Sequence, residues 1–244
     1  MNNGLTERDF ELAFYLKSKD YKLEGLSFEK AKESGIQQIK KDGIQAQDWL
    51  DVFYPKEQRK EKKKLWIDEK NLIGSLDLSD FTELEELWCS RNKLTSLSSL
   101  GKKLEVIAGW DNNFSGDLSV FSNLTNLETL DISGSYFFGS LEPLKNLTKL
   151  RELDISNTDI NSGLEYLPDS IKKIKCSSNQ RKDAKIKIIA QELMKYKEDE
   201  LQGDEGDDEI QLSREDELDE SSDDGSFYPY ELQEEESGYN CLSS

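Results

Sequence analysis

The feature that most constrains this chain is an internal repeat that runs through residues 62–181. The pattern L-x-x-L-x-L-x-x-N-x-L recurs in six units, which begin at residues 62, 84, 104, 127, 150 and 171. The steps between these starts are 22, 20, 23, 23 and 21 residues. Such a period indicates a stack of similar units, each of which buries its apolar face against the next. The sequence therefore predicts a solenoid.

Each unit opens with an alternation of apolar and polar residues. Counting from the first residue of a unit, positions 4 and 6 are apolar, while positions 5 and 7 are polar or aromatic except for Ala108. This alternation is typical of a strand with one face in the core. The strands of successive units are expected to pair into one parallel sheet. Cys89 and Cys176 stand at position 6, where we expect small core residues rather than reactive thiols.

These units resemble those of the leucine-rich-repeat family. The resemblance implies an α/β solenoid of about six repeats with a concave parallel sheet. It also implies that the side chain at position 9 is buried and bonds to the backbone of adjacent turns. Asn92 and Asn112 hold that position, and Ser135 and Thr158 are expected to be weaker substitutes.

A short G-S/D-L segment follows in three of the units, at Gly74–Leu76, Gly116–Leu118 and Gly139–Leu141. It resembles the turn of the plant-type subclass of leucine-rich repeats. The proline usual in that turn is missing, so we do not expect a second small sheet.

A solenoid needs capped ends, because a terminal unit otherwise exposes its core to water. Residues 1–61 are expected to form a helical N-terminal cap, and Pro55 is expected to end the last of its helices. Segment Ala46–Lys60 also resembles a cap found ahead of the repeats in expanded fungal leucine-rich-repeat families. Apolar residues recur at helical spacing in three segments of this cap: Leu5–Leu16, Phe28–Ile39 and Ile44–Phe53.

The chain beyond the repeats divides into a short apolar stretch and an acidic one. Residues 182–197 are expected to form a closing helix, because Ile186, Ile189, Leu193 and Tyr196 share one helical face. Residues 198–244 hold 19 of the 51 acidic residues and one of the 32 basic residues. With so little apolar surface, they are expected to form a disordered acidic tail.

The composition argues against catalysis. The chain has no histidine, which removes the most frequent general base and the commonest zinc ligand. Its three cysteines lie far apart and form no pair at metal-binding spacing. We therefore predict that the protein is not an enzyme and uses no metal, cofactor or small-molecule substrate.

Charge and hydropathy also bound the partners and the location. Residues 1–197 are nearly neutral, with 32 acidic and 31 basic residues, so nucleic acid is not an expected partner. The first twenty residues carry charges where a signal peptide needs an apolar run, and no segment approaches about 18 consecutive apolar residues. We expect a cytoplasmic or nuclear protein that is not secreted and binds no membrane.

Three tryptophans mark the candidate binding site on the concave face. Trp66 and Trp88 are both at position 5, and Trp110 is at position 7, so all three should lie on one surface. Exposed aromatic residues ringed by charge are typical of binding hot spots. Two alternatives remain open: the Trp49 helix covers Trp66, or the rings only stabilise the sheet. The charged residues predicted around the patch are Glu86, Arg91, Glu105 and Asp111. The acids Asp131 and Asp154 continue the column of position 5 toward Lys175 and complete the candidate site.

The sequence thus favours a protein-interaction module, an adaptor or scaffold, that binds a protein partner of unknown identity through the concave face. One alternative also comes from resemblance. Repeats followed by an acidic tail are similar to acidic-tailed nuclear leucine-rich-repeat proteins, which chaperone histones or regulate phosphatases.

Overall fold

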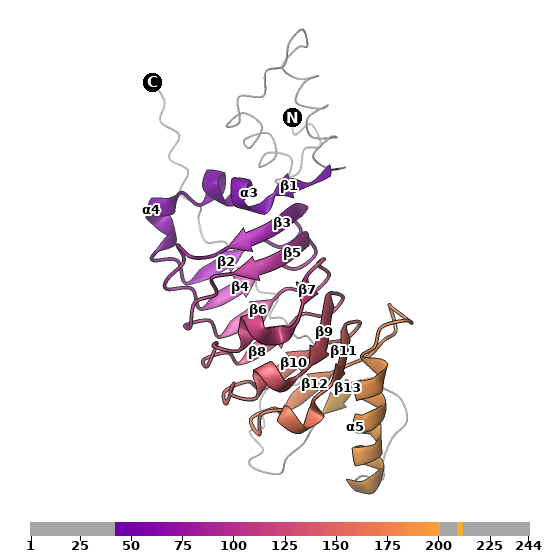
Figure 1. Cartoon of the computed structure of the whole chain (residues 1–244). Helices are drawn as coiled ribbons and strands as arrows, with labels where there is room; N and C mark the ends of the chain where they lie inside the picture. Colours follow the sequence, from indigo (N-terminus) through magenta and orange to yellow (C-terminus); the bar gives the residue numbers. More distant parts are fainter. Residues whose placement is uncertain (1–41, 201–208, 212–244) are drawn as a thin grey trace, which may run out of the picture. The chain divides into compact units, whose positions relative to one another are not determined.

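The computed structural model describes residues 42–200 and 209–211. A seven-stranded sheet, here called the main sheet, has the order β13-β12-β10-β8-β6-β4-β2 (Figure 1). Its strands β2 to β12 are parallel, and each comes from positions 3–5 of one predicted unit. The six strands are β2 (Lys64–Trp66), β4 (Glu86–Trp88), β6 (Val106–Ala108), β8 (Thr129–Asp131), β10 (Glu152–Asp154) and β12 (Lys173–Lys175).

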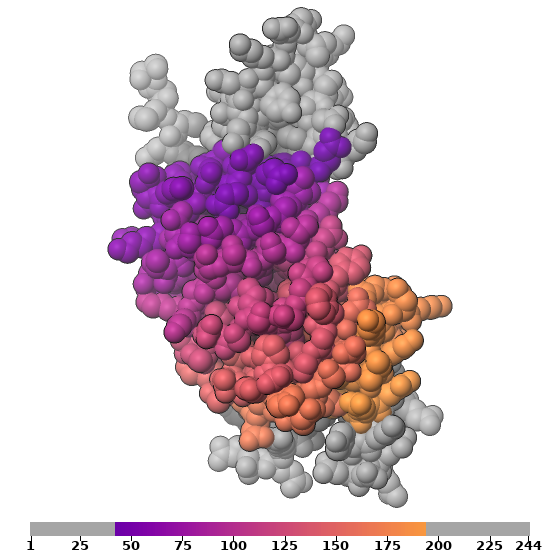
Figure 2. Space-filling model, in the orientation of Figure 1, coloured from indigo at the N-terminus to yellow at the C-terminus, as the bar shows by residue number. Residues whose placement is uncertain are grey.

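The register of the main sheet explains the core. Leu65 pairs with Leu87, and Leu87 with Ile107, so position 4 forms one column across all six strands. Every side chain in this column is fully buried. The predicted solenoid with a parallel sheet is therefore confirmed, and successive units follow one another as bands of colour in Figure 2.

Position 9 links each unit to its neighbours through the backbone. The Asn92 amide accepts a hydrogen bond from the backbone N of Leu72 at 2.9 Å and donates to the Ile67 carbonyl at 2.8 Å. At the same position the Thr158 hydroxyl donates one bond, to the Ile155 carbonyl at 2.6 Å. The buried Ser135 hydroxyl has no hydrogen-bond partner among the described residues. The expected ranking of Asn above Ser and Thr is confirmed.

The expectation of no second sheet was wrong, because two three-stranded side sheets accompany the main sheet. Gly74 and Gly139 lie inside side-sheet strands at φ of 82° and 89°, values that favour glycine. The chain therefore enters these strands without the proline that is usual in the plant-type turn. One side sheet contains β1 (Ile44–Gln45), β3 (Leu72–Asp77) and β5 (Lys93–Ser98). The other contains β7 (Ser115–Gly116), β9 (Tyr136–Ser140) and β11 (Asp159–Ser162).

Short 3-10 helices follow the side-sheet strands in the third, fourth and fifth units. They are η1 (Leu118–Phe121), η2 (Glu142–Leu144) and η3 (Leu164–Tyr166). The helical part of each of these repeats is thus a single tight turn rather than an α-helix.

At the N-terminal end, the described part of the cap contains α3 (Ala46–Phe53) and α4 (Lys56–Arg59). The first helix starts two residues later than the predicted Ile44, because Ile44 pairs with Leu72 in β1. Pro55 separates the two helices, as predicted. The helices predicted at Leu5–Leu16 and Phe28–Ile39 lie outside the described residues.

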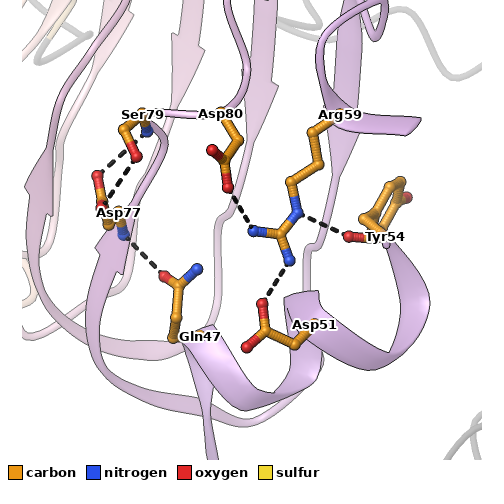
Figure 3. A network of polar contacts seen from close by, with 7 residues as sticks. All are labelled: Gln47, Asp51, Tyr54, Arg59, Asp77, Ser79 and Asp80. Atoms are coloured by element: carbon orange, nitrogen blue, oxygen red, sulfur yellow. Dashed lines mark hydrogen bonds and ion pairs between the residues drawn. The ribbon is translucent and has the colours of Figure 1, made fainter. Parts of the chain in front are cut away.

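A buried arginine joins this cap to the first repeat (Figure 3). Arg59 is only 1% exposed, and its Nε donates to the Tyr54 carbonyl at 2.7 Å. Its Nη2 lies 2.5 Å from Asp51 Oδ1 in α3, and its Nη1 lies 3.1 Å from Asp80 Oδ2 beyond β3. One guanidinium therefore holds three acceptors from the cap and the repeat.

At the other end, α5 (Lys187–Glu200) starts five residues later than residue 182, where the closing helix was expected. Ile186, Ile189 and Leu193 are buried, as their spacing predicted. The expectation of disorder from residue 198 onward was wrong in two places. Residues 198–200 continue α5, and β13 (Glu209–Gln211) pairs antiparallel with β12 at the end of the main sheet. The rest of the predicted tail lies outside the described residues.

Candidate functional site

The outward face of the main sheet brings two of the predicted tryptophans side by side. Trp66 and Trp88 are register partners on β2 and β4. Trp66 is 50% exposed, and Trp88 is half-buried. Trp49 is buried within the cap, where its ring stacks on Phe53 at 4.6 Å. The alternative in which the Trp49 helix covers Trp66 is therefore wrong.

Charged side chains orient the Trp88 ring. Trp88 Nε1 donates to Glu86 Oε2 at 3.1 Å, across two residues of β4. Glu86 Oε1 also lies 3.0 Å from Lys64 Nζ on the neighbouring strand β2. Glu86 thus holds the Trp88 ring by a hydrogen bond and also forms an ion pair with the neighbouring strand.

Trp110 lies after β6 and is half-buried. The guanidinium carbon of Arg91 lies 4.4 Å from the centre of the Trp110 ring, a cation–π geometry. Arg91 Nη1 is also 2.6 Å from Glu69 Oε1. Arg91, Asp111 and Glu69 share position 8 of their units, and each has a left-handed backbone with φ between 52° and 55°. This turn sets where the charges at the ends of the strands project.

The predicted acids Asp131 and Asp154 lie in the next part of the face. They are register partners on β8 and β10, and Asp154 pairs in turn with Lys175 on β12. Asp131 is buried at 4% exposure, which contradicts its predicted place on an exposed binding surface. It accepts hydrogen bonds from the backbone N and the hydroxyl of Ser133 at 3.0 and 2.7 Å.

Asp154 is partly buried beside this acid. Burial, together with the negative charge of Asp131, raises the pKa of the Asp154 carboxyl to about 6. A hydrogen bond from Ser156 N at 2.9 Å opposes this rise. The two carboxylates therefore repel each other in partly desolvated surroundings.

Taken together, the main sheet brings the predicted site residues onto one face in two groups. The first group, which we call the tryptophan patch, contains Trp66, Trp88 and Trp110, with Glu86, Arg91 and the exposed Asp111 beside them. The second group is the Asp131–Asp154 pair, which is less accessible than the sequence predicted.

No family model and no curated protein matches this chain. Among solved structures, it is similar to the leucine-rich-repeat ectodomain of the receptor kinase SOBIR1 from Arabidopsis thaliana. The two share 33% identity over 40% of this chain and 57% of that one, with a TM-score of 0.37.

Two further solved structures show similar repeats. The ectodomain of the Arabidopsis thaliana receptor kinase GASSHO1/SCHENGEN3 shares 29% identity over 44% of this chain and 14% of that one, with a TM-score of 0.41. An internalin, inlF, from Listeria monocytogenes shares 17% identity over 50% of this chain and 43% of that one, with a TM-score of 0.35.

The deciding observation is internal to the chain: each unit of 20–23 residues contributes one parallel strand, and in the second and third units a buried asparagine at position 9 bonds to the backbone of the neighbouring unit. The chain folds as a solenoid of leucine-rich-repeat type.

The cysteines of the leucine-rich repeats are part of the core. Cys89 and Cys176 are both buried, and burial raises the pKa of the Cys89 thiol far above its ordinary value. Such a thiol is a poor nucleophile. Within residues 42–200 and 209–211, no cluster of three or more His, Cys, Asp or Glu side chains has the arrangement of a metal site. No helix in the same ranges is long and apolar enough to cross a membrane.

Two surface aromatics of the leucine-rich repeats were missed by the sequence reasoning. Tyr136 and Phe138 lie on β9 in a side sheet and are 49% and 50% exposed. The sequence did contain a signal for them. Positions 10 and 12 are polar in the second, third and fifth units, so two aromatic residues at these positions of the fourth unit depart from the pattern. This signal was overlooked because no second sheet was expected there.

Proposed function

We propose that this leucine-rich-repeat protein is a protein-interaction module that binds a partner protein through the outward face of its main sheet. The observation that carries the proposal is the 50% exposure of Trp66 beside its register partner Trp88. A large aromatic ring left half exposed on a regular sheet contributes less to the fold than a buried one, but it offers apolar area to a partner.

The geometry around the patch supports this role. Glu86 and Arg91 hold the rings of Trp88 and Trp110 by a hydrogen bond and a cation–π contact, so little side-chain entropy is lost on binding. Trp66 and Trp88 stand on paired strands rather than on loops, which keeps this part of the surface rigid. Binding energy at such surfaces concentrates in a few aromatic and arginine side chains.

The experiment compares two exposed aromatic residues that lie on different elements. A partner is first captured with the full chain and identified, and its dissociation constant is then measured by calorimetry with variants. Trp66→Ala should weaken binding by about 2 kcal/mol, roughly 30-fold. Tyr166→Ala is the control, because Tyr166 is 37% exposed but lies on η3, outside the main sheet.

The melting temperature separates binding from folding. Both variants should unfold within a few degrees of the parent chain, because neither ring is part of the buried core. If Trp66→Ala binds the partner as tightly as the parent chain does, the main-sheet face is not the binding surface. A large loss of stability in Trp66→Ala would instead support the other alternative, in which the rings stabilise the sheet.

The finer role follows from the same proposal. We infer an adaptor or scaffold that joins proteins without catalysis and acts in the cytoplasm or the nucleus. Localisation of the tagged full chain by microscopy tests the second statement, and a signal confined to the secretory pathway would contradict it. No described residue specifically favours the histone-chaperone or phosphatase-regulator alternative.

A further inference from the structure

The side sheet β7–β9–β11 carries two aromatic side chains that are about half exposed. Tyr136 and Phe138 are two residues apart on the middle strand β9, so both point away from the core. Phe137 between them points inward, and its ring lies 5.9 Å from that of Phe114 and 5.5 Å from that of Phe121. The inward position alone therefore supplies the packing.

The same positions differ in other units. Positions 10 and 12 carry polar or charged side chains in the second, third and fifth units: Lys93, Thr95, Asn113, Ser115, Asp159 and Asn161. Only in the fourth unit are both positions aromatic. Because the same backbone positions tolerate polar residues, stability of the repeat does not explain Tyr136 and Phe138.

An arginine from a later segment is held beside these rings. The Arg181 guanidinium carbon lies 5.1 Å from the centre of the Tyr136 ring, and Nη1 donates to the Ser135 carbonyl at 3.3 Å. Nη2 forms an ion pair with Asp159, which is the register partner of Phe138 on β11. The positive group is thus fixed at the border of the aromatic pair.

The segment after Arg181 adds further positive charge along the edge of the side sheet. The backbone N of Lys185 donates to Asp159 Oδ1 at 3.3 Å, and that of Ile186 to the Thr158 carbonyl at 3.2 Å. Lys182, Lys185 and Lys187 are exposed. Residues 181–187 therefore contain four basic residues and one acid, Asp183, and Asp159 on β11 is a second acid beside them.

We propose that this second surface, formed by Tyr136, Phe138, Arg181, Lys182 and Lys185, docks an acidic segment of a protein partner. An apolar side chain of the segment packs on Tyr136 and Phe138, and its carboxylates face the basic residues. This docking is separate from the tryptophan patch and does not depend on it. A nucleic acid is the alternative occupant, because its phosphates would meet the same basic residues, and the test below separates the two.

The test uses the full chain and a short fluorescent peptide of Asp and Glu with one central Phe, followed by fluorescence polarisation. Phe138→Ser should weaken peptide binding at least about tenfold, since removing an exposed aromatic anchor removes its contact area. Replacing the central Phe of the peptide by Ser should have a similar effect. Added salt should weaken binding, because the charges are exposed.

Two controls keep the result independent of folding and of the proposed function. Trp66→Ala should leave peptide binding unchanged, so failure at one surface is distinguishable from failure at the other. The Lys182→Glu and Lys185→Glu double variant keeps both aromatic rings and should also lose binding.

Three outcomes would overturn the proposal. The first is equal peptide binding by the parent chain and Phe138→Ser. The second is a Phe138-dependent affinity for oligothymidylate that exceeds the affinity for the peptide, which would indicate nucleic acid. The third is a dimer, detected by analytical ultracentrifugation, that Phe138→Ser dissociates, which would identify a second copy of the chain as the occupant.

Discussion

Asn92 and Asn112 donate hydrogen bonds to the same acceptor, the carbonyl oxygen of Cys89, from Nδ2 at 3.0 and 2.9 Å. The Asn112 Oδ1 also accepts from the backbone N of Leu94 at 3.0 Å. The position-9 side chains of two successive repeats therefore bond to one carbonyl. Each amide forms hydrogen bonds with backbone groups outside the strands of the main sheet. This arrangement couples the second and third units through buried polar bonds.

Asn112→Ala should therefore lower the free energy of unfolding by about 2–3 kcal/mol, since it leaves buried backbone groups without partners. Ser135→Ala is the matched control at the same position of the next unit, where the hydroxyl has no partner among the described residues. It should change stability by less than about 1 kcal/mol. Urea titration followed by circular dichroism measures both values. Similar losses in the two variants would mean that position 9 acts through its volume rather than its hydrogen bonds.

Much of the fold could be predicted from the sequence. The period of the repeat and the alternation around position 4 were sufficient for the strands, their register and the buried column, because those features depend on local spacing alone. The tryptophan patch followed for the same reason. Once Trp66 and Trp88 share a position in the unit, a parallel sheet must place them side by side.

Burial at a given position depended on contacts that spacing does not reveal. Asp131 and Trp66 occupy the same position in their units, yet Asp131 is 4% exposed and Trp66 is 50% exposed. The ion pairs of Arg59 join residues 8 and 21 positions apart in the sequence, and no local pattern predicts them. The side sheets were missed because a backbone with glycine at positive φ can enter a strand without the proline of the plant-type turn.

The buried arginine of the cap gives a second prediction. Arg59→Met keeps most of the side-chain volume but removes the hydrogen bond to the Tyr54 carbonyl and both ion pairs. We expect a loss of about 2–3 kcal/mol in the free energy of unfolding. Asp80→Asn should lose less than about 1 kcal/mol, because the Asp80 side chain is 41% exposed and Arg59 keeps Asp51. Equal effects of the two substitutions in urea titrations would show that the arginine is not the centre of this contact.

The pH dependence of stability provides a third prediction. The pKa of Asp154 is raised to about 6, above its ordinary value near about 4. A raised carboxyl pKa means that the charged form destabilises the fold above pH 6 and that this penalty disappears as the pH falls toward 4. Asp154→Asn should therefore be more stable than the parent chain at pH 7.5, by about 1 kcal/mol, and the difference should shrink at pH 4.5.

The groups that face Asp154 define the control for this experiment. Asp131 on β8, Lys175 on β12 and the Ser156 backbone N all act on its carboxyl, and an asparagine Oδ1 can still accept the Ser156 bond. Glu165→Gln on η3 removes the same charge from an exposed position outside the main sheet. It should show no such pH-dependent gain. A constant difference between Asp154→Asn and the parent chain from pH 4.5 to 7.5 would contradict the assignment.

The pairing of β13 with β12 gives a prediction about truncation. β12 ends the row of parallel strands, and without β13 its outer edge would present unpaired backbone groups, a common cause of association between chains. Truncation after Ser213 keeps β13 and should leave both the melting temperature and the monomeric state unchanged. Truncation after Glu200 removes β13 and should lower the melting temperature by a few degrees and produce concentration-dependent association in analytical ultracentrifugation.

A point variant in the full chain tests the same pairing. Ile210→Pro removes a donor from the middle of β13 and should reproduce the truncation after Glu200, because proline cannot complete the ladder. If both truncated chains melt and sediment like the parent chain, the strand pair contributes nothing to the fold, whereas a loss already present after Ser213 would show that residues 214–244 stabilise it.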